Sequence, residues 1–185
     1  MANNAKEAAA PHQSDIEKDA GKNPVSFRRV VTINKEPAEL YQFWRNFEHL
    51  PRFMQHLESV QMIDERRSHW VARAPFGTKA EWDAEITEDR VGELISWRSL
   101  PDATVQHAGS VAFKPAPGGR GTEVTVDMAY TPPLGVVGRI AARLAKEEPA
   151  QQIADDLHNL KMMLETGEIA TNVMRLEDKQ KEAGS

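Results

Sequence analysis

Apolar and polar residues alternate through the middle of the chain in the pattern typical of β-strands. Residues 79–88 show it most clearly, because four apolar side chains share one parity and three acidic side chains the other: Ala80, Trp82, Ala84 and Ile86 against Glu81, Asp83 and Glu85. Successive side chains of a strand point to opposite faces of a sheet. The pattern therefore predicts a strand with one buried face and one face in water. Residues 122–131 repeat it.

Seven runs of this kind are predicted, at residues 26–33, 57–64, 68–75, 79–88, 92–99, 105–114 and 122–131. The connections between the last six runs are short and rich in turn-forming residues, which favours an antiparallel meander. Between the first two runs, Pro37 with Glu39 predicts the start of a short helix over 37–44, and a second short helix is expected over 48–54.

The apolar period changes near the C-terminus, where a long helix is predicted from near Pro149 to Gly167. At about 100° per residue its apolar side chains form one narrow stripe: Ile153, Leu157, Leu160 and Leu164. Such a stripe needs a partner surface, and the predicted sheet supplies it. The chain is therefore expected to have an α+β fold, in which the helix packs on the buried face of a curved, seven-stranded antiparallel sheet.

Composition narrows the possible functions. The chain of 185 residues is 40% hydrophobic and 28% charged, which fits one globular domain at 25–171 between flexible polar tails at 1–24 and 172–185. The absence of cysteine excludes disulfides and cysteine-ligated metals. A net charge of −5 argues against nucleic acid as a partner. Without a signal-peptide core or about 20 consecutive apolar residues, we expect a cytoplasmic protein with no transmembrane segment.

Two tryptophans lie at positions that could line a cavity under the helix. Trp82 has the apolar parity of its strand, and Trp97 shares a parity with Ile95. Plain core packing is the alternative for both. The full lining that we predict suits an apolar or aromatic ligand with few polar anchors. It consists of Phe53, Met54, Trp82, Trp97, His107, Met128, Tyr130, Ile153, Leu157, Leu160 and Leu164.

His107 is the one strand histidine placed on the predicted buried face, because it shares a parity with Gly109 and Val111. A neutral imidazole there could donate to a ligand carbonyl or act as a base, whereas a structural core histidine is the alternative. Arg98 and Asp127 have the parity opposite to that of their apolar neighbours, so neither is expected to be a catalytic partner.

No metal site and no cofactor are expected. Asp155 and His158 have the i, i+3 spacing of metal ligands on a helix, but they lie away from the leucine stripe. The polar group of Asp155, Asp156, His158 and Asn159 is therefore predicted to face water. The glycines at 118–121 do not precede a helix, which indicates a hairpin turn rather than a phosphate loop. The glycine-containing segment 134–138 could be a gate, a transient membrane contact at Leu134–Val137, or a flexible connector.

Five stretches resemble the polyketide cyclase/dehydrase-like branch of the SRPBCC superfamily, which includes the START and birch-pollen-allergen proteins: FWRNFEHLPRFM at 43–54, ISWRS at 95–99, GSVAF at 109–113, PAPGGRGTEVT at 115–125 and YTPP at 130–133. The chain is also similar to coenzyme Q-binding START-like proteins. The resemblance covers about 25–171 and implies a helix-grip fold. It does not imply one reaction, since relatives range from lipid and quinone carriers to aromatase/cyclases.

Two functions follow from the residues and the resemblance. The first is a binding or carrier protein, without enzymatic activity, for a hydrophobic small molecule such as a lipid, an isoprenoid quinone or an aromatic polyketide-like compound. The alternative is a cyclase/dehydrase acting on a poly-carbonyl or aromatic substrate, with His107 and Tyr130 as its polar pair. Positioning alone can supply much of such a rate. A weaker third interpretation is an interaction module that uses the charged tails. The oligomeric state stays open.

Overall fold

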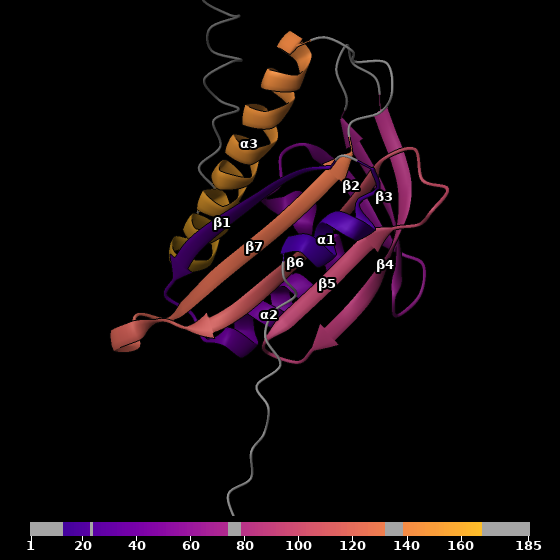
Figure 1. Ribbon diagram of the computed structural model, residues 1–185. Helices are drawn as coiled ribbons and strands as arrows, with labels where there is room; N and C mark the ends of the chain where they lie inside the picture. Colours follow the sequence, from indigo (N-terminus) through magenta and orange to yellow (C-terminus); the bar gives the residue numbers. More distant parts are fainter. Residues whose placement is uncertain (1–12, 23, 74–78, 132–138, 168–185) are drawn as a thin grey trace, which may run out of the picture.

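The computed structural model describes residues 13–22, 24–73, 79–131 and 139–167, with the backbone alone described for 139–149. Figure 1 shows the order of its elements. They are α1 (Gln13–Asp19), β1 (Val25–Ile33), α2 (Pro37–Arg45), the 3-10 helix η1 (Phe47–Arg52), β2 (Leu57–Met62), β3 (Arg67–Arg73), β4 (Lys79–Arg90), β5 (Leu94–Ser99), β6 (Gln106–Pro115), the 3-10 turn η3 (Pro117–Gly119), β7 (Thr122–Thr131) and α3 (Arg139–Thr166).

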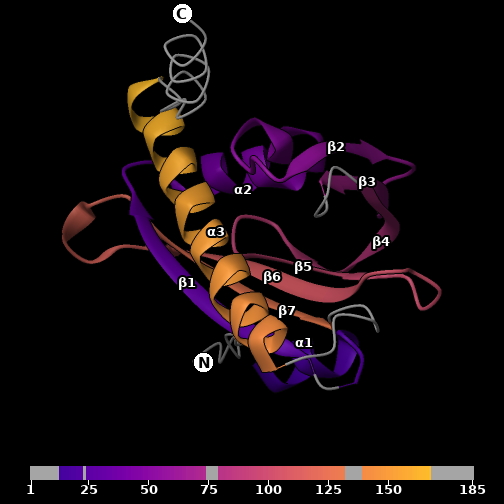
Figure 2. The same cartoon turned by 90° about the horizontal axis from the view of Figure 1, so that it is seen from above.

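One antiparallel sheet contains all seven strands in the order β1-β7-β6-β5-β4-β3-β2, so the first strand pairs with the last. This confirms the predicted meander and the α+β class, and each strand ends within two residues of its prediction. In Figure 2 the sheet curves so that β2 and β3 rise toward α2. Helices α2 and α3 lie on its inner side and α1 lies on its outer side.

The main core lies between the inner face of the sheet and the elements η1, α2 and α3. Its most deeply buried aromatic side chains come from the short helices and the turn that follows them, with Trp44, Phe47 and Phe53 each 1% exposed. Inner-face residues of the strands, among them Ile86 and Trp97, complete the same cluster. The alternation that predicted a buried parity in β4 is thus confirmed.

Helix α3 begins at Arg139, ten residues before the predicted start near Pro149. The prediction was wrong because a proline inside a helix removes a single backbone donor from the ladder, and here the helix continues on both sides of it. Its end is confirmed: Gly167 has a φ of 76°, and its N–H donates to Met163 O at 3.1 Å. The segment 134–138, for which a gate was considered, lies outside the described residues.

Helix α1 falls within residues 1–24, which the sequence analysis treats as a flexible tail. Ile16 and Ala20 are buried against Ala108 and Ala129 on the outer face of β6 and β7. The two strand alanines are small enough for α1 to approach the sheet closely. Because they are distant in the sequence, the sequence around α1 alone does not predict that this short helix is held against the sheet. Of the helices in the described part of the chain, none has the length and apolarity needed to cross a bilayer.

The turn between β6 and β7 is the hairpin predicted from its glycines. Gly121 has a φ of 86°, and a Cβ atom there would lie 2.2 Å from Ile33 O. Glycine is therefore required both by the backbone angle and by the approach of β1. Thr122 Oγ1 then donates to Lys35 O at 2.6 Å, which ties the turn to the end of β1.

Candidate functional site

Two tryptophans and a histidine form a cluster on the inner face of the sheet. Trp70 of β3 and Trp82 of β4 are paired across the strands, and their rings stack with centroids 6.0 Å apart at 21°. The ring of His107, on β6, meets both edge-on at 6.0 Å and 5.2 Å respectively. We call Trp70, Trp82 and His107 the tryptophan–histidine cluster.

The imidazole of His107 is buried, as its parity predicted, and is 4% exposed. Its backbone N–H donates to Ser99 Oγ at 3.0 Å, whereas Nδ1 and Nε2 have no hydrogen-bond partner among the described residues. Burial lowers the pKa of His107 to about 4. The ring is therefore neutral near pH 7 and offers one donor and one acceptor.

The neighbouring indoles differ in their hydrogen bonding. Trp70 Nε1 donates to Ser68 Oγ at 2.8 Å, but Trp82 Nε1 and Trp97 Nε1 are buried without a partner in the part of the chain that the structure describes. Three ring systems on this face thus present four unpaired polar atoms. Buried polar groups are normally hydrogen-bonded, so four unpaired polar atoms on one face of the sheet are unusual.

Gly109 sets the position of Trp97. In the sheet register, Trp97 of β5, Gly109 of β6 and Met128 of β7 lie side by side. A Cβ atom on Gly109 would lie 2.6 Å from Trp97 Cζ2 and 2.5 Å from Met128 Sδ. The indole therefore lies against the bare backbone of β6, one row of side chains from His107.

The inner face is only partly covered near the cluster. Trp82 and Met128 pack against the core yet are half-buried, and Tyr130, directly opposite His107 in the register, is half-buried as well. Three large side chains of the inner face are therefore partly exposed next to the buried ring of His107.

Helix α3 brings the predicted stripe to the other side of the core. Ile153, Leu157 and Leu160 are buried, and Leu164 is half-buried against the same cluster of residues. Phe53 and Met54 are buried there too. The main core thus gathers the predicted lining residues except Tyr130 and His107, and His107 touches it through its ring contacts with Trp70 and Trp82. Their role as the lining of a ligand site stays a prediction. Met163, which is buried, and Trp70 were missed, although the alternation of Ser68, Trp70 and Ala72 could have identified the tryptophan.

The polar face of α3 does not all face water. Asp155 and His158 are exposed as predicted, but Asp156 and Asn159 are buried, at 2% and 8% exposure. The prediction failed for these two because α3 packs against the end of η1 as well as against β1. Within the described residues no group of acidic or histidine side chains could hold a metal ion.

Hydrogen bonds join this face of α3 to the segment after η1. Asp156 Oδ1 accepts from Gln55 N at 3.3 Å, and Asn159 Nδ2 donates to Phe53 O at 3.4 Å. Asp156 Oδ2 also lies 3.2 Å from His56 Nδ1, without the alignment of a hydrogen bond. These contacts fix α3 across the inner side of the sheet.

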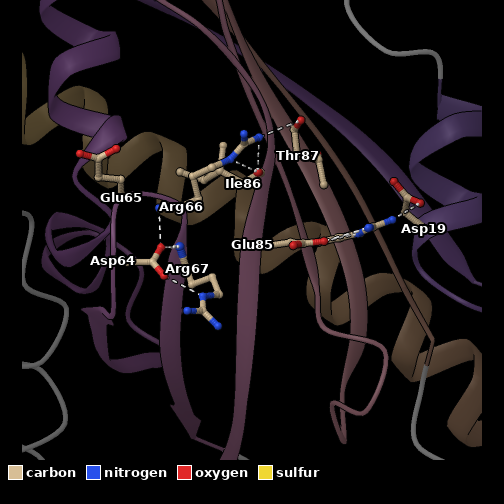
Figure 3. A pocket seen from close by; sticks show the side chains of 9 residues that line it. Asp19, Asp64, Glu65, Arg66, Arg67, Glu85, Ile86 and Thr87 are labelled. Atoms are coloured by element: carbon tan, nitrogen blue, oxygen red, sulfur yellow. Dashed lines mark hydrogen bonds and ion pairs between the residues drawn. The ribbon is translucent and has the colours of Figure 1, made fainter.

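An open pocket of about 860 Å³ lies apart from this site (Figure 3). Its arginines already have partners: Arg67 pairs with Asp64 at 2.7 Å, Arg98 pairs with Glu85 at 2.8 Å, and Arg66 donates to Ile86 O. The pocket is therefore lined mainly by charged side chains that pair with one another. The lining consists of Asp19, Asp64, Glu65, Arg66, Arg67, Glu85, Ile86, Thr87 and Arg98.

Arg98 and Asp127 lie on the outer face, as their parity predicted, but the expectation that this face of the last strand lies in water was wrong for Asp127. Arg98 lies on the outer face, where it also pairs with Asp19 of α1 at 3.3 Å. Asp127 is buried on the outer face beneath Arg28, whose Nε donates to it at 2.7 Å. Neither side chain belongs to the tryptophan–histidine cluster, and neither is expected to take part in its chemistry.

Two proteins of known structure resemble this chain, one in both sequence and fold and the other in fold alone. A protein of Deinococcus radiodurans, DR_A0006, is 41% identical over 77% of this chain and 99% of its own, with a TM-score of 0.63. A START superfamily protein from Mycobacterium smegmatis is 14% identical over 75% of this chain and 98% of its own, with a TM-score of 0.62. This second likeness extends to the fold alone and confirms the predicted helix-grip fold.

A sequence relative and a family model agree with the structures. An uncharacterized 17.2 kDa protein of Streptomyces lincolnensis is 34% identical over 73 residues, which are 40% of this chain and 47% of that protein. The match therefore spans less than half of that relative. The family model described as polyketide cyclase/dehydrase and lipid transport matches residues 33–158. The chain belongs to the polyketide cyclase/dehydrase and lipid transport family, as its resemblance to the SRPBCC superfamily predicted.

Proposed function

We propose that this protein binds and carries a hydrophobic small molecule between the inner face of the sheet and α3. The observation that carries the proposal is the partly exposed aromatic face around a buried His107 whose ring nitrogens have no partner among the described residues. An apolar wall with a few placed polar atoms is the usual makeup of a small-molecule site. The family description, which includes lipid transport, supports the same function.

The electrostatics of His107 favour binding over acid–base catalysis. A general base works best when its pKa is near the operating pH. Burial lowers the pKa of His107 to about 4, so its neutral ring is a weak base. The ring of His107 contacts Trp70 and Trp82, and no ion pair among the described residues involves His107. These contacts therefore do not provide His107 with an acidic partner for acid–base catalysis.

Native mass spectrometry of gently purified full-length protein, followed by organic extraction, tests the proposal. We expect a fraction of the molecules to carry an extractable apolar compound. Met128→Trp would fill space beside Trp97 and should lower that occupancy, whereas Val91→Trp, at a turn position that is 83% exposed, should not. Circular dichroism would verify that both variants fold. A protein found empty in repeated preparations, and equal occupancy of the two variants, would each contradict the proposal.

A cyclase/dehydrase acting in the same place is the second candidate. His107 and Tyr130 are the polar pair that the sequence analysis predicts for this activity. The observation that favours it is that the two residues lie directly opposite each other in the register of β6 and β7. The family description includes this activity as well. Turnover of a poly-carbonyl substrate should then fall in both His107→Ala and Tyr130→Phe. Unchanged turnover in the two variants would exclude the role. A cytoplasmic location and the oligomeric state stay predictions to be tested separately.

A further inference from the structure

Helix α1 covers the outer face of the sheet at the end where the tryptophan–histidine cluster occupies the inner face. Ile16 and Ala20 are 4% and 0% exposed, and they pack against Ala108 of β6 and Ala129 of β7. His107, which directly precedes Ala108, turns its ring to the inner face. Figure 2 shows α1 on the side of the sheet opposite to α2 and α3. The helix and the cluster thus lie on the two faces of the same strand ends, because successive side chains of a strand alternate between faces.

Polar contacts fasten α1 to the neighbouring strand ends as well. Thr131 Oγ1, at the end of β7, donates to Ala20 O at 2.6 Å. Asp19 pairs with Arg98 of β5 at 3.3 Å, and the hydroxyl of Ser26 in β1 donates to a glutamate of α1. The helix therefore joins the beginnings of β1 and β6 to the ends of β5 and β7.

The short helix depends on these contacts for its order. An isolated helix of seven residues is unstable in water, because nucleation costs more than its few hydrogen bonds return. The ion pair between Lys18 and Asp15 within the helix is exposed and adds little. Burial of Ile16 and Ala20 therefore supplies most of the stabilisation, and α1 can leave the sheet without global unfolding.

Release of α1 would uncover strand ends whose other face is already partly exposed. Met128 and Tyr130 of β7 are half-buried on the inner face. Regions with few buried apolar contacts open locally at low free energy. Losing the contact on the outer face should therefore loosen 106–108 of β6 and 129–131 of β7, which contain His107 and Tyr130.

We propose that α1 is a dissociable strap, which orders the ends of β6 and β7 when it is docked and loosens them when it is released. Coupling between two sites is reciprocal, so a molecule bound on the inner face of these strand ends favours the docked strap. The ordering of the strand ends needs no ligand, whereas the coupling to a bound molecule rests on the proposed function.

Amide hydrogen exchange of the full-length protein, measured by mass spectrometry, tests the strap. Ile16→Asp places a carboxylate in an apolar contact and should release α1, so exchange of 106–108 and 129–131 should become at least about tenfold faster. Exchange in β2 and β3, at the opposite edge of the sheet from β1, should change by about twofold or less. Val91→Asp is the matched control, because it adds the same charge at a position that is 83% exposed and should change neither region.

Limited trypsin digestion measures the release itself. The docked helix protects the peptide bond after Lys18, and Thr131 Oγ1 also donates to Lys22 O at 3.3 Å. Cleavage after these two lysines should be at least about tenfold faster in Ile16→Asp than in the native protein. Faster cleavage with unchanged exchange at 106–108 and 129–131 would overturn the strap, and so would unchanged cleavage. If Ile16→Asp does not fold, Ile16→Ala takes its place, with an acceleration of about fivefold expected and none as the contrary result.

The uncharged apolar dye N-phenyl-1-naphthylamine tests the coupling to a bound molecule. Its affinity should be about three- to tenfold weaker in Ile16→Asp than in the native protein, and saturating dye should slow native cleavage after Lys18 by a similar factor. Val91→Asp should bind the dye as the native protein does. Equal affinities together with unchanged cleavage would overturn the coupling. Absence of dye binding to the native protein would count against the proposed function, whereas the exchange rates would still decide whether α1 orders the strand ends.

Discussion

The two ends of the inner face are built from similar residues but packed differently. At the end covered by α2 and η1, Trp44, Phe47 and Leu50 are each 1% exposed and belong to a continuous cluster of rings and aliphatic side chains. At the other end Trp82 and Met128 keep part of their surface exposed. We call these the closed end and the open end.

The two ends also differ in the elements that their aromatic contacts join. Ring contacts at the closed end link α2 to β6, as in Trp44 with Phe113 at 6.4 Å. At the open end Trp70, Trp82 and His107 contact one another within the sheet, and Phe47 of η1 also contacts Trp70, at 5.5 Å. The two ends therefore differ in the partial exposure of Trp82 and Met128, and the proposed function places the ligand at the end where these side chains lie.

Truncating one tryptophan at each end should give the largest contrast. Trp44→Ala leaves a cavity in a fully packed region and should lower the free energy of unfolding by about 3–5 kcal/mol. Trp82→Ala removes a half-buried ring and should cost about half as much or less, because part of that ring already contacts solvent. Urea unfolding followed by circular dichroism would measure both values.

A conservative pair controls for the loss of ring stacking in this comparison. Trp44→Phe and Trp82→Phe keep a ring, so both should cost less than the matching alanine variants. Equal losses for the two alanine variants would mean that the open end is packed as fully as the closed end. The distinction between the two ends would then fail.

Acidification should act on the open end through His107. Burial lowers the pKa of His107 from 6.5 to about 4, so between these values the unfolded chain binds more protons than the folded one. Its contribution to stability is therefore complete above about pH 6.5 and is lost as the pH falls toward 4, by on the order of 3 kcal/mol. Unfolding measured near pH 7 and near pH 4.5 should be less pH-dependent in His107→Gln than in the native sequence.

His69 provides the matched control for acidification. It is a partly exposed strand histidine whose Nδ1 lies 2.7 Å from Asp83 Oδ1, away from the cluster. His69→Gln should keep the extra loss of stability that buried His107 causes. If His107→Gln retained the full pH dependence of the native protein, protonation of this ring would not be what weakens the open end.

The sequence was sufficient for the sheet because alternation is a local property. Trp82 and His107 could be assigned to the inner face from their parity alone, and both assignments are confirmed. The pairing of Trp82 with Trp70 could not be predicted, because it depends on the register between two strands. The missing hydrogen-bond partners of His107 are likewise visible only once the neighbouring strands are in place.

Packing from two sides explains where sequence reasoning failed. A helical wheel has one apolar stripe, and the stripe of α3 was identified through Leu157 and Leu160. The helical wheel did not predict that the polar side chains of Asp156 and Asn159 would also be buried. Their hydrogen-bond partners are backbone groups of a segment that is distant in the sequence. The helix start was misplaced because Pro149 lies inside α3 instead of beginning it.

The attachment of α3 at the closed end gives the smallest of the three predicted effects. Asp156→Ala removes the acceptor of the Gln55 N–H together with a carboxylate that is itself buried, and should cost about 1–3 kcal/mol. Asp155→Ala changes the adjacent residue, whose exposed carboxylate accepts from Gln151 at 2.8 Å on the same helix, and should cost about 0.5 kcal/mol or less.

Hydrogen exchange would locate the effect of losing this attachment. Because Asp156 joins α3 to the segment after η1, its loss should speed amide exchange in 150–166 and in 53–57 more than in β3 and β4. Equal free energies of unfolding for Asp155→Ala and Asp156→Ala would contradict this role. A selective increase of exchange in β3 and β4 would instead mean that α3 is held mainly through the open end, which reverses the comparison between the two ends.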